Sequence, residues 1–213
     1  MIDDSPFYCG EVTSEDGGAA LVFVTDDQLR LLHSAHVVHV DAMFRVVLYL
    51  YHQLFTIFVP HAEYAFPACF ALMTCKTTTL YEAVLKKLSA IEPQFLPTQV
   101  ITDFQEAPTA ALRNVNGNQL MVSGCWFHHA QALIKRLCKL GLTDAYRNDA
   151  DMQTIFRCLL SLPLLLVTDT ASGFQELKAL LPAQSATSAS MSQLLCYVER
   201  QWINKSTLQV VCA

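Results

Sequence analysis

Residues 99–108 read QVITDFQEAP, a short apolar run that ends at one acidic residue, Asp103. A run of this length is typical of a strand buried on both faces of a sheet. Asp103 stands where the strand pattern stops, so it caps the next helix, lies in a solvated turn, or belongs to a metal site. Capping fits poorly, because Pro108 would then lie inside the helix and remove a hydrogen bond.

Whether Asp103 has a second carboxylate beside it depends on the strands that precede it. Three strand patterns come earlier in the chain, at residues 36–44, 52–60 and 65–73. The first, HVVHVDAMF, is rich in β-branched residues and carries Asp41 near its end. Short connections between the three patterns predict consecutive antiparallel strands.

Helices are predicted on either side of these strands. Residues 26–35 form a short helical pattern that Asp26 can cap. Residues 76–91 form the clearest helix, in which Thr79 and Glu82 have the spacing of a capping box. Its core stripe is Leu80, Val84, Leu88 and Ile91.

After residue 108 the chain becomes mostly helical. A second helix begins near Pro108, and residues 119–125 form a fifth strand. The helix at residues 126–140 is followed by Gly141 and Leu142, which is typical of a Schellman ending. Only helices are predicted from residue 143 onward, with a flexible linker at residues 182–190 and a last helix at 191–204.

The order of these elements predicts an α/β fold with a mixed five-stranded sheet flanked by helices. Right-handed crossovers allow the first strand to lie in the centre, between the second strand and the fourth. Asp41 and Asp103 would then lie side by side, although 62 positions separate them. We therefore divide the chain into a lead-in at residues 1–35, a core at 36–142 and a helical segment at 143–213.

Two adjacent carboxylates repel each other unless a cation lies between them or one is protonated. Carboxylate oxygens suit Mg²⁺ or Mn²⁺, and such ions can activate the attacking oxygen and stabilise the leaving oxygen in phosphodiester chemistry. Taken alone, Asp41 is equally explained by a solvated turn at the end of a strand, whereas a capping or turn role explains Asp103 less well.

The composition limits the function classes. Of 213 residues 53% are hydrophobic and 15% charged, which indicates a chain that folds around a core. The net charge of −5 argues against a strong grip on DNA by this chain alone. No apolar run is long enough to cross a membrane and no signal peptide is evident, so the eight cysteines are expected to be reduced thiols.

Cys125 and His128 have the C-x-x-H spacing that occurs in half of a zinc site. No convincing second pair of ligands accompanies them, and the histidines at positions 33, 36 and 39 straddle a helix-to-strand break. We predict that Cys125 and His128 lie near the acidic pair and bind no zinc.

Several ordered blocks together carry a family resemblance. VDAMFRVV, PACFALMTCKTTTLYEAVLKKL, VITDFQEAPTAAL and SGCWFHHAQALIKRLCKLGL resemble the catalytic domain of Mutator-like element (MULE) transposases over about residues 36–180. The resemblance implies an RNase H-like fold with a helical insertion. It also implies nuclear DNA cleavage and strand transfer at transposon ends by an Asp-Asp-Glu triad with Mg²⁺ or Mn²⁺.

In this family resemblance Asp41 takes the first acidic position and Asp103 the second. Cys125 and His128 match the family's C-x-x-H element near the active site. Glu199 is the candidate for the third acid, although the family's glutamate alternatively lies in an Asn-rich segment further along. The family's Asp-Gly-Thr-Phe block is Asp-Ala-Met-Phe here, starting at Asp41.

The resulting expectation is a fragment or domesticated derivative of a MULE transposase with weak or no activity, no membrane contact, and self-association into a homo-oligomer. Two alternatives stay open. One is a non-catalytic module for protein interaction or regulation that keeps the fold; the location implied by the resemblance is nuclear, and without the resemblance it would be cytoplasmic. The other is a generic RNase H-like nuclease.

Overall fold

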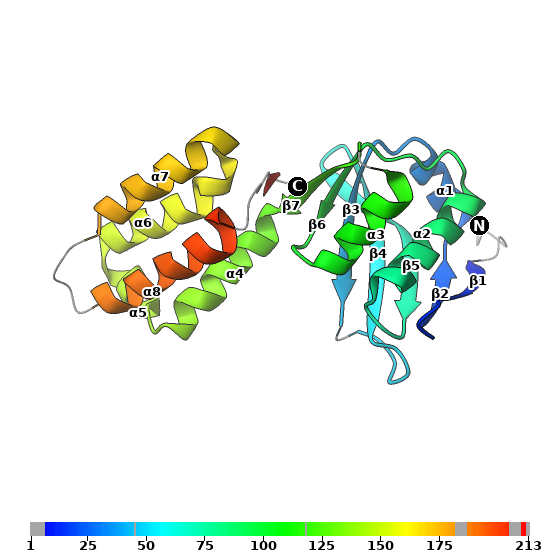
Figure 1. Ribbon diagram of the computed structural model, residues 1–213, viewed down its shortest axis with the longest axis horizontal. Helices are drawn as coiled ribbons and strands as arrows, with labels where there is room; N and C mark the ends of the chain where they lie inside the picture. Colours follow the sequence, from blue (N-terminus) through cyan, green and yellow to red (C-terminus); the bar gives the residue numbers. More distant parts are fainter. Residues whose placement is uncertain (1–6, 45, 118, 182–186, 205–209, 212–213) are drawn as a thin grey trace. The chain divides into compact units, whose positions relative to one another are not determined.

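The computed structural model describes residues 7–44, 46–117, 119–181, 187–204 and 210–211. The chain forms two compact units, Met1–Val122 and Ser123–Ala213. The first unit is a sheet with helices packed on it, and the second consists mainly of helices (Figure 1). Each unit has a hydrophobic core of its own.

The sheet is mixed, and its strand order is β1-β2-β5-β4-β3-β6-β7-β8. The strands are β1 (Tyr8–Thr13), β2 (Ala19–Phe23), β3 (Val37–Met43), β4 (Gln53–His61), β5 (Tyr64–Met73), β6 (Gln99–Thr102), β7 (Met121–Cys125) and the two-residue β8 (Val210–Val211). The boundary between the two units falls within β7. An α/β fold with a mixed sheet flanked by helices is thus confirmed.

The central strand is the one that the sequence predicts. β3 pairs antiparallel with β4, β4 pairs antiparallel with β5, and β3 pairs in parallel with β6. The predicted number of five strands is too low, because β1 and β2 form an antiparallel hairpin that extends the sheet beside β5. Ala20, Val22 and Val24 bury one face of this added edge.

Helices α1 (Asp26–His33), α2 (Thr78–Ile91) and α3 (Glu106–Asn116) belong to the first unit, and α2 and α3 lie together on one face of the sheet (Figure 1). Leu80, Val84 and Leu88 of α2 are buried, as the stripe predicts. Many apolar contacts of this kind stabilise the layer, because each buried aliphatic side chain contributes about 1.5–3 kcal/mol.

Two predicted helix caps are wrong. Thr25, not Asp26, caps α1, and its side chain accepts a hydrogen bond from the backbone of Gln28 in a complete capping box. At α2 the predicted box at Thr79 does not form, because the helix begins earlier with Thr77 as its N-cap. The Thr79 hydroxyl instead donates to the Asp16 carboxylate at 2.9 Å.

The second unit packs its helices around a core that includes Leu133, Phe156 and Leu194. Its elements are α4 (Trp126–Lys139), α5 (Thr143–Asn148), α6 (Ala150–Ser161), the 3₁₀ turn η1 (Leu162–Leu164), α7 (Val167–Ala179), α8 (Ser188–Val198) and the π-helical turn η2 (Glu199–Ile203). The apolar face of α4 contributes Leu133 and Leu137 to this core, and the compact unit begins at residue 123.

α4 ends in the predicted Schellman motif. Gly141 has φ 70°, the Leu142 N–H donates to the Leu137 carbonyl, and the Gly141 N–H donates to the Cys138 carbonyl. The last helix begins at Ser188, within the segment predicted to be linker, and residues 182–186 of that segment lie outside the described residues. Among the described helices none is long and apolar enough to cross a membrane.

Candidate active site

Strand pairing relates Asp41 to Asp103. The parallel register joins Val37 to Gln99 and Val40 to Thr102, with a constant offset of 62 residues. Asp41 and Asp103 each follow the last of these pairs by one residue and keep the same offset. Register partners on neighbouring strands lie about 4.8 Å apart and point to the same face of the sheet. The topology therefore places both aspartates at the same end of the sheet, where β3 and β6 have their carboxyl ends.

Asp41 occupies the less buried face of β3. Val38, Val40 and Ala42 are buried on the opposite face, which gives the strand its alternating pattern. The Asp41 Oδ1 atom accepts a hydrogen bond from the Ala42 N–H at 2.8 Å. The side chain is partly exposed.

The cross-strand neighbour of Asp41 is Thr56 on β4. Thr56 is fully buried, and within the described part of the chain its hydroxyl has no hydrogen-bond partner. A buried polar atom without a partner is costly, by about 1–3 kcal/mol.

Asp103 lies in a short turn between β6 and α3. Its Oδ2 atom accepts a hydrogen bond from the Gln105 amide at 2.6 Å, and its backbone carbonyl accepts the Gln105 N–H at 2.7 Å. Gln105 is the N-cap of α3, so the helix starts at Glu106, three residues beyond Asp103. Pro108 falls in the first turn of α3, where its missing N–H removes no internal hydrogen bond.

A buried polar pair, Gln53 and Tyr81, lies within the electrostatic reach of Asp103. The Gln53 amide donates to the Tyr81 hydroxyl at 2.7 Å, and both side chains are buried. Burial raises the pKa of Tyr81 to about 12, the bond from Gln53 lowers it in part, and the negative charge of Asp103 raises it further. Sequence reasoning missed this pair, although Gln53 interrupts an apolar strand run and so gave a signal.

Cys125 and His128 lie at the start of α4, in the second unit. Cys125 is the N-cap, and His128 is three residues further along. Burial alone would raise the pKa of the Cys125 thiol, but hydrogen bonds from the His128 side chain and from the backbone of His128 and Phe127 bring that pKa below its usual value. A thiol so placed has increased thiolate character. Their predicted position near the acidic pair stays a prediction.

Glu199 lies in the second unit and has a cationic partner there. It is the first residue of the π-helical turn that continues α8. Both of its carboxylate oxygens lie 3.2 Å from the Lys178 Nζ atom. π-helical turns occur often at functional sites, but this carboxylate is engaged with a lysine of α7. Its role as a third acid stays a prediction.

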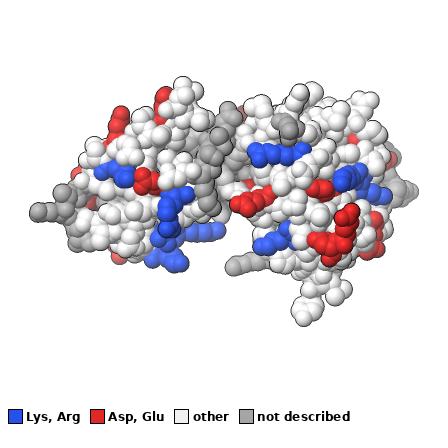
Figure 2. Space-filling model, viewed as in Figure 1, with Lys and Arg blue, Asp and Glu red and all other residues white. Residues whose placement is uncertain are grey.

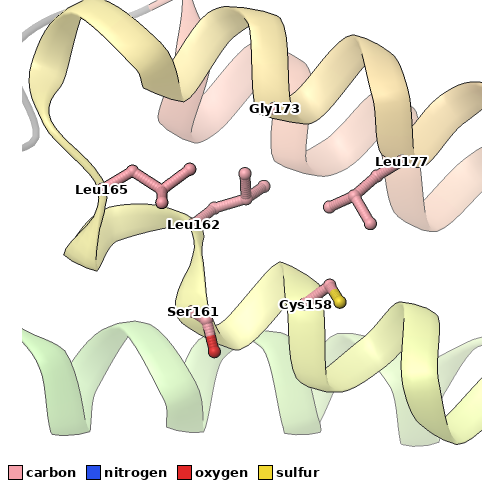
Figure 3. A pocket seen from close by; sticks show the side chains of 6 residues that line it. All are labelled: Cys158, Ser161, Leu162, Leu165, Gly173 and Leu177. Atoms are coloured by element: carbon pink, nitrogen blue, oxygen red, sulfur yellow. The ribbon is translucent and has the colours of Figure 1, made fainter.

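Within the described ranges, no group of three or more His, Cys, Asp or Glu side chains is arranged to hold a metal ion. The second unit contains a separate apolar pocket of about 230 Å³ between α6, η1 and α7 (Figure 3). Its lining residues are Cys158, Ser161, Leu162, Leu165, Gly173 and Leu177. No carboxylate or histidine lines this pocket, so the carboxyl ends of β3 and β6 are the better candidate for chemistry.

Comparison with known families gives a match in the part of the chain that contains these strands. Residues 37–132 match the family described as the MULE transposase domain. The matched segment starts at β3, contains both aspartates, and extends through Cys125 and His128 into α4. No curated protein matches the chain. The chain therefore carries a MULE-type transposase domain at residues 37–132.

Proposed function

We propose that this transposase-derived protein has an RNase H-like core and that Asp41 and Asp103 hold Mg²⁺ or Mn²⁺ for cleavage and strand transfer of DNA. The observation that carries the proposal is the constant β3–β6 register, which relates the two aspartates. Three antiparallel strands followed by a parallel fourth strand also support it.

The carboxylate oxygens at the carboxyl ends of β3 and β6 suit a hard divalent cation. Asp41 and Asp103 offer carboxylate oxygens, which Mg²⁺ and Mn²⁺ prefer, and such ions keep several water ligands. When bound, the ion would stabilise negative charge on the oxygens of a scissile phosphate. The protein's own part is to hold the two carboxylates side by side, with Gln105 fixing Asp103 through its 2.6 Å hydrogen bond.

Glu199 fits the proposal less directly, because its carboxylate is paired with Lys178. To act as a third ligand it would have to leave that ion pair. This observation favours a second candidate function, a non-catalytic derivative that keeps the fold as an interaction or regulatory module. Nuclear location and self-association follow from the transposase proposal and are part of it.

The test measures Mn²⁺ binding by electron paramagnetic resonance and Mn²⁺-dependent nicking or joining of labelled DNA. We expect Asp41→Asn and Asp103→Asn each to weaken Mn²⁺ binding by roughly tenfold or more and to remove any nicking. Glu63→Gln is the matched control, because it removes one charge from the β4–β5 turn, at the opposite end of the sheet.

Three outcomes separate the candidates. Nicking that both asparagine variants abolish supports a catalytic site. Mn²⁺ binding without nicking, unchanged by Glu199→Gln, supports the non-catalytic derivative. Mn²⁺ binding that neither asparagine variant changes would refute the proposed metal site.

A further inference from the structure

The net charge of the chain is divided unevenly between its two units. Residues 1–122 contain six Lys and Arg against 13 Asp and Glu, whereas residues 123–213 contain eight against six. The overall charge of −5 is therefore the sum of a strongly acidic first unit and a weakly basic second unit. An argument about DNA binding must be made for each unit separately, because affinity depends on local Lys and Arg.

The basic side chains of the second unit are concentrated on α4. The helix carries Lys135, Arg136 and Lys139 and has no acidic residue over its 14 positions. Figure 2 shows Lys and Arg side chains gathered over this helix. Lys135 and Lys139 are exposed and four positions apart, so they lie one turn from each other on the same face.

None of these three cations is neutralised by a carboxylate of the described residues. The Lys135 Nζ atom lies 3.3 Å from the Gln131 side-chain oxygen, and the Arg136 guanidinium stacks on the Tyr197 ring at 5.4 Å. By contrast, Lys86 pairs with Glu82 and Lys178 pairs with Glu199. Lys135 and Lys139 thus retain their full charge toward solvent.

The same face of α4 carries exposed apolar side chains. Phe127 is 58% exposed and Ile134 is 48% exposed. With helical spacing, Phe127, Gln131, Ile134, Lys135 and Cys138 form one stripe along the helix, and Lys139 lies beside it, one turn beyond Lys135. Favourable interaction of Arg136 and Lys139 with the helix dipole explains basic residues in the last turn, but it does not explain an exposed aromatic ring in the first.

We propose that this face of α4, with Lys135 and Lys139 as its charged contacts and Phe127 as its aromatic contact, binds the backbone of duplex DNA. Lysine ammonium groups without carboxylate partners suit phosphate oxygens, and an exposed aromatic ring can pack against the sugars beside them. The inference rests on the function proposed above, since it names the surface through which that function reaches its DNA.

The test uses the full chain and a fluorescein-labelled 30-base-pair duplex, with anisotropy measured from 25 to 200 mM KCl. The variant is Lys135→Gln/Lys139→Gln. The matched control is Lys76→Gln/Lys86→Gln, which removes two exposed lysines from the first unit. We expect the α4 variant to bind roughly tenfold more weakly at low salt and to reduce the slope of log K against log salt by about 1.8.

The control should keep the wild-type slope. Phe127→Ala should weaken binding but should also keep the wild-type slope, because phenylalanine carries no charge. Equal losses in the two double variants would show a general charge effect and would overturn the proposal, as would wild-type protein that does not bind the duplex at 25 mM KCl. Asp103→Asn separates this inference from the proposed chemistry. Binding that survives in Asp103→Asn and fails in the α4 variant supports the surface even if the chain cleaves no DNA.

Discussion

His129 is an ionisable side chain in the apolar interior of the second unit. It is 1% exposed, and its ring contacts the Trp202 ring edge-on with centroids 4.7 Å apart. Burial lowers its pKa to about 4, and the nearby backbone of Leu159 offsets only part of that effect. The imidazole is therefore neutral in the folded chain at neutral pH.

The unfolded chain binds a proton on this histidine at a higher pH than the folded chain does. Protonation of His129 therefore favours the unfolded chain. The folded state keeps its full stability above the unfolded pKa of about 6.5 and loses stability as the pH falls toward 4. We predict that protonation of His129 in the unfolded chain lowers the free energy of unfolding by about 3 kcal/mol between pH 7 and pH 4. Urea unfolding at several pH values measures it.

His129→Phe should reduce the pH dependence over this range by a similar amount, because phenylalanine keeps the ring contact and cannot titrate. The control is His61→Phe, at an exposed position in the first unit. An identical pH dependence in wild type and His129→Phe would contradict the prediction.

At the scale of single elements, the spacing of hydrophobic residues in the sequence predicts most of the helices and strands. The strands at residues 37–43, 53–61 and 64–73 match their predicted ranges closely, and so do β6, α2 and α4. Helix caps were predicted less well, because Thr25 and Asp26 can each begin α1 and only the fold decides which side chain faces the Gln28 backbone. The β1–β2 hairpin was missed because its pairing with β5 is a long-range contact.

Some features of the candidate site could likewise be predicted from the sequence, and others could not. Asp41 and Asp103 could be related from the sequence, since strand order and parallel register are consequences of short connections and right-handed crossovers. The Lys178–Glu199 ion pair could not, because it joins positions on two helices separated by a polar segment. Gln53, Tyr81 and Thr56 were missed for a related reason: their burial depends on packing between layers.

Two glycines in helical surroundings should respond to substitution in opposite directions. Gly141 follows α4 with φ 70°, a conformation that alanine adopts poorly, so Gly141→Ala should destabilise the chain by about 1 kcal/mol. Gly173 lies inside α7, where alanine is the better helix former by about 1 kcal/mol. An added Cβ there would lie 3.0 Å from a methyl group of Leu165, a side chain that is 46% exposed and can shift.

Chemical unfolding of Gly141→Ala and Gly173→Ala measures both effects, with Gly141→Asn as the control, because asparagine tolerates the left-handed conformation better than alanine. Gly173→Ala should be more stable than wild type. A destabilised Gly173→Ala would show that Leu165 is held firmly against α7.

At the scale of the whole molecule, two separate cores suggest two cooperative units. The first core includes Phe55, Tyr81 and Leu85, the second includes Phe174 and Leu194, and the two share no residue. We predict two transitions in differential scanning calorimetry. Leu85→Ala should lower the midpoint of one and Leu194→Ala the midpoint of the other, each variant losing about 2–5 kcal/mol in its own unit.

Assignment of the two transitions comes from tryptophan fluorescence, because Trp126 and Trp202, the two tryptophans of the chain, both lie in the second unit. The fluorescence change should follow the transition that Leu194→Ala shifts. A single transition moved equally by both variants would mean that the units unfold together.

The constant register between β3 and β6 also bears on how such a chain can vary in length during evolution. Backbone hydrogen bonds, and not the 62-residue separation, fix the register from Val37–Gln99 to Val40–Thr102 that relates Asp41 to Asp103. Residues gained or lost in the β4–β5 turn, or between α2 and β6, would change the separation and leave this register unchanged. One residue gained inside β3 or β6 would send an aspartate to the other face. Related chains are expected to show variable spacing between the two acids and gap-free segments immediately before each of them.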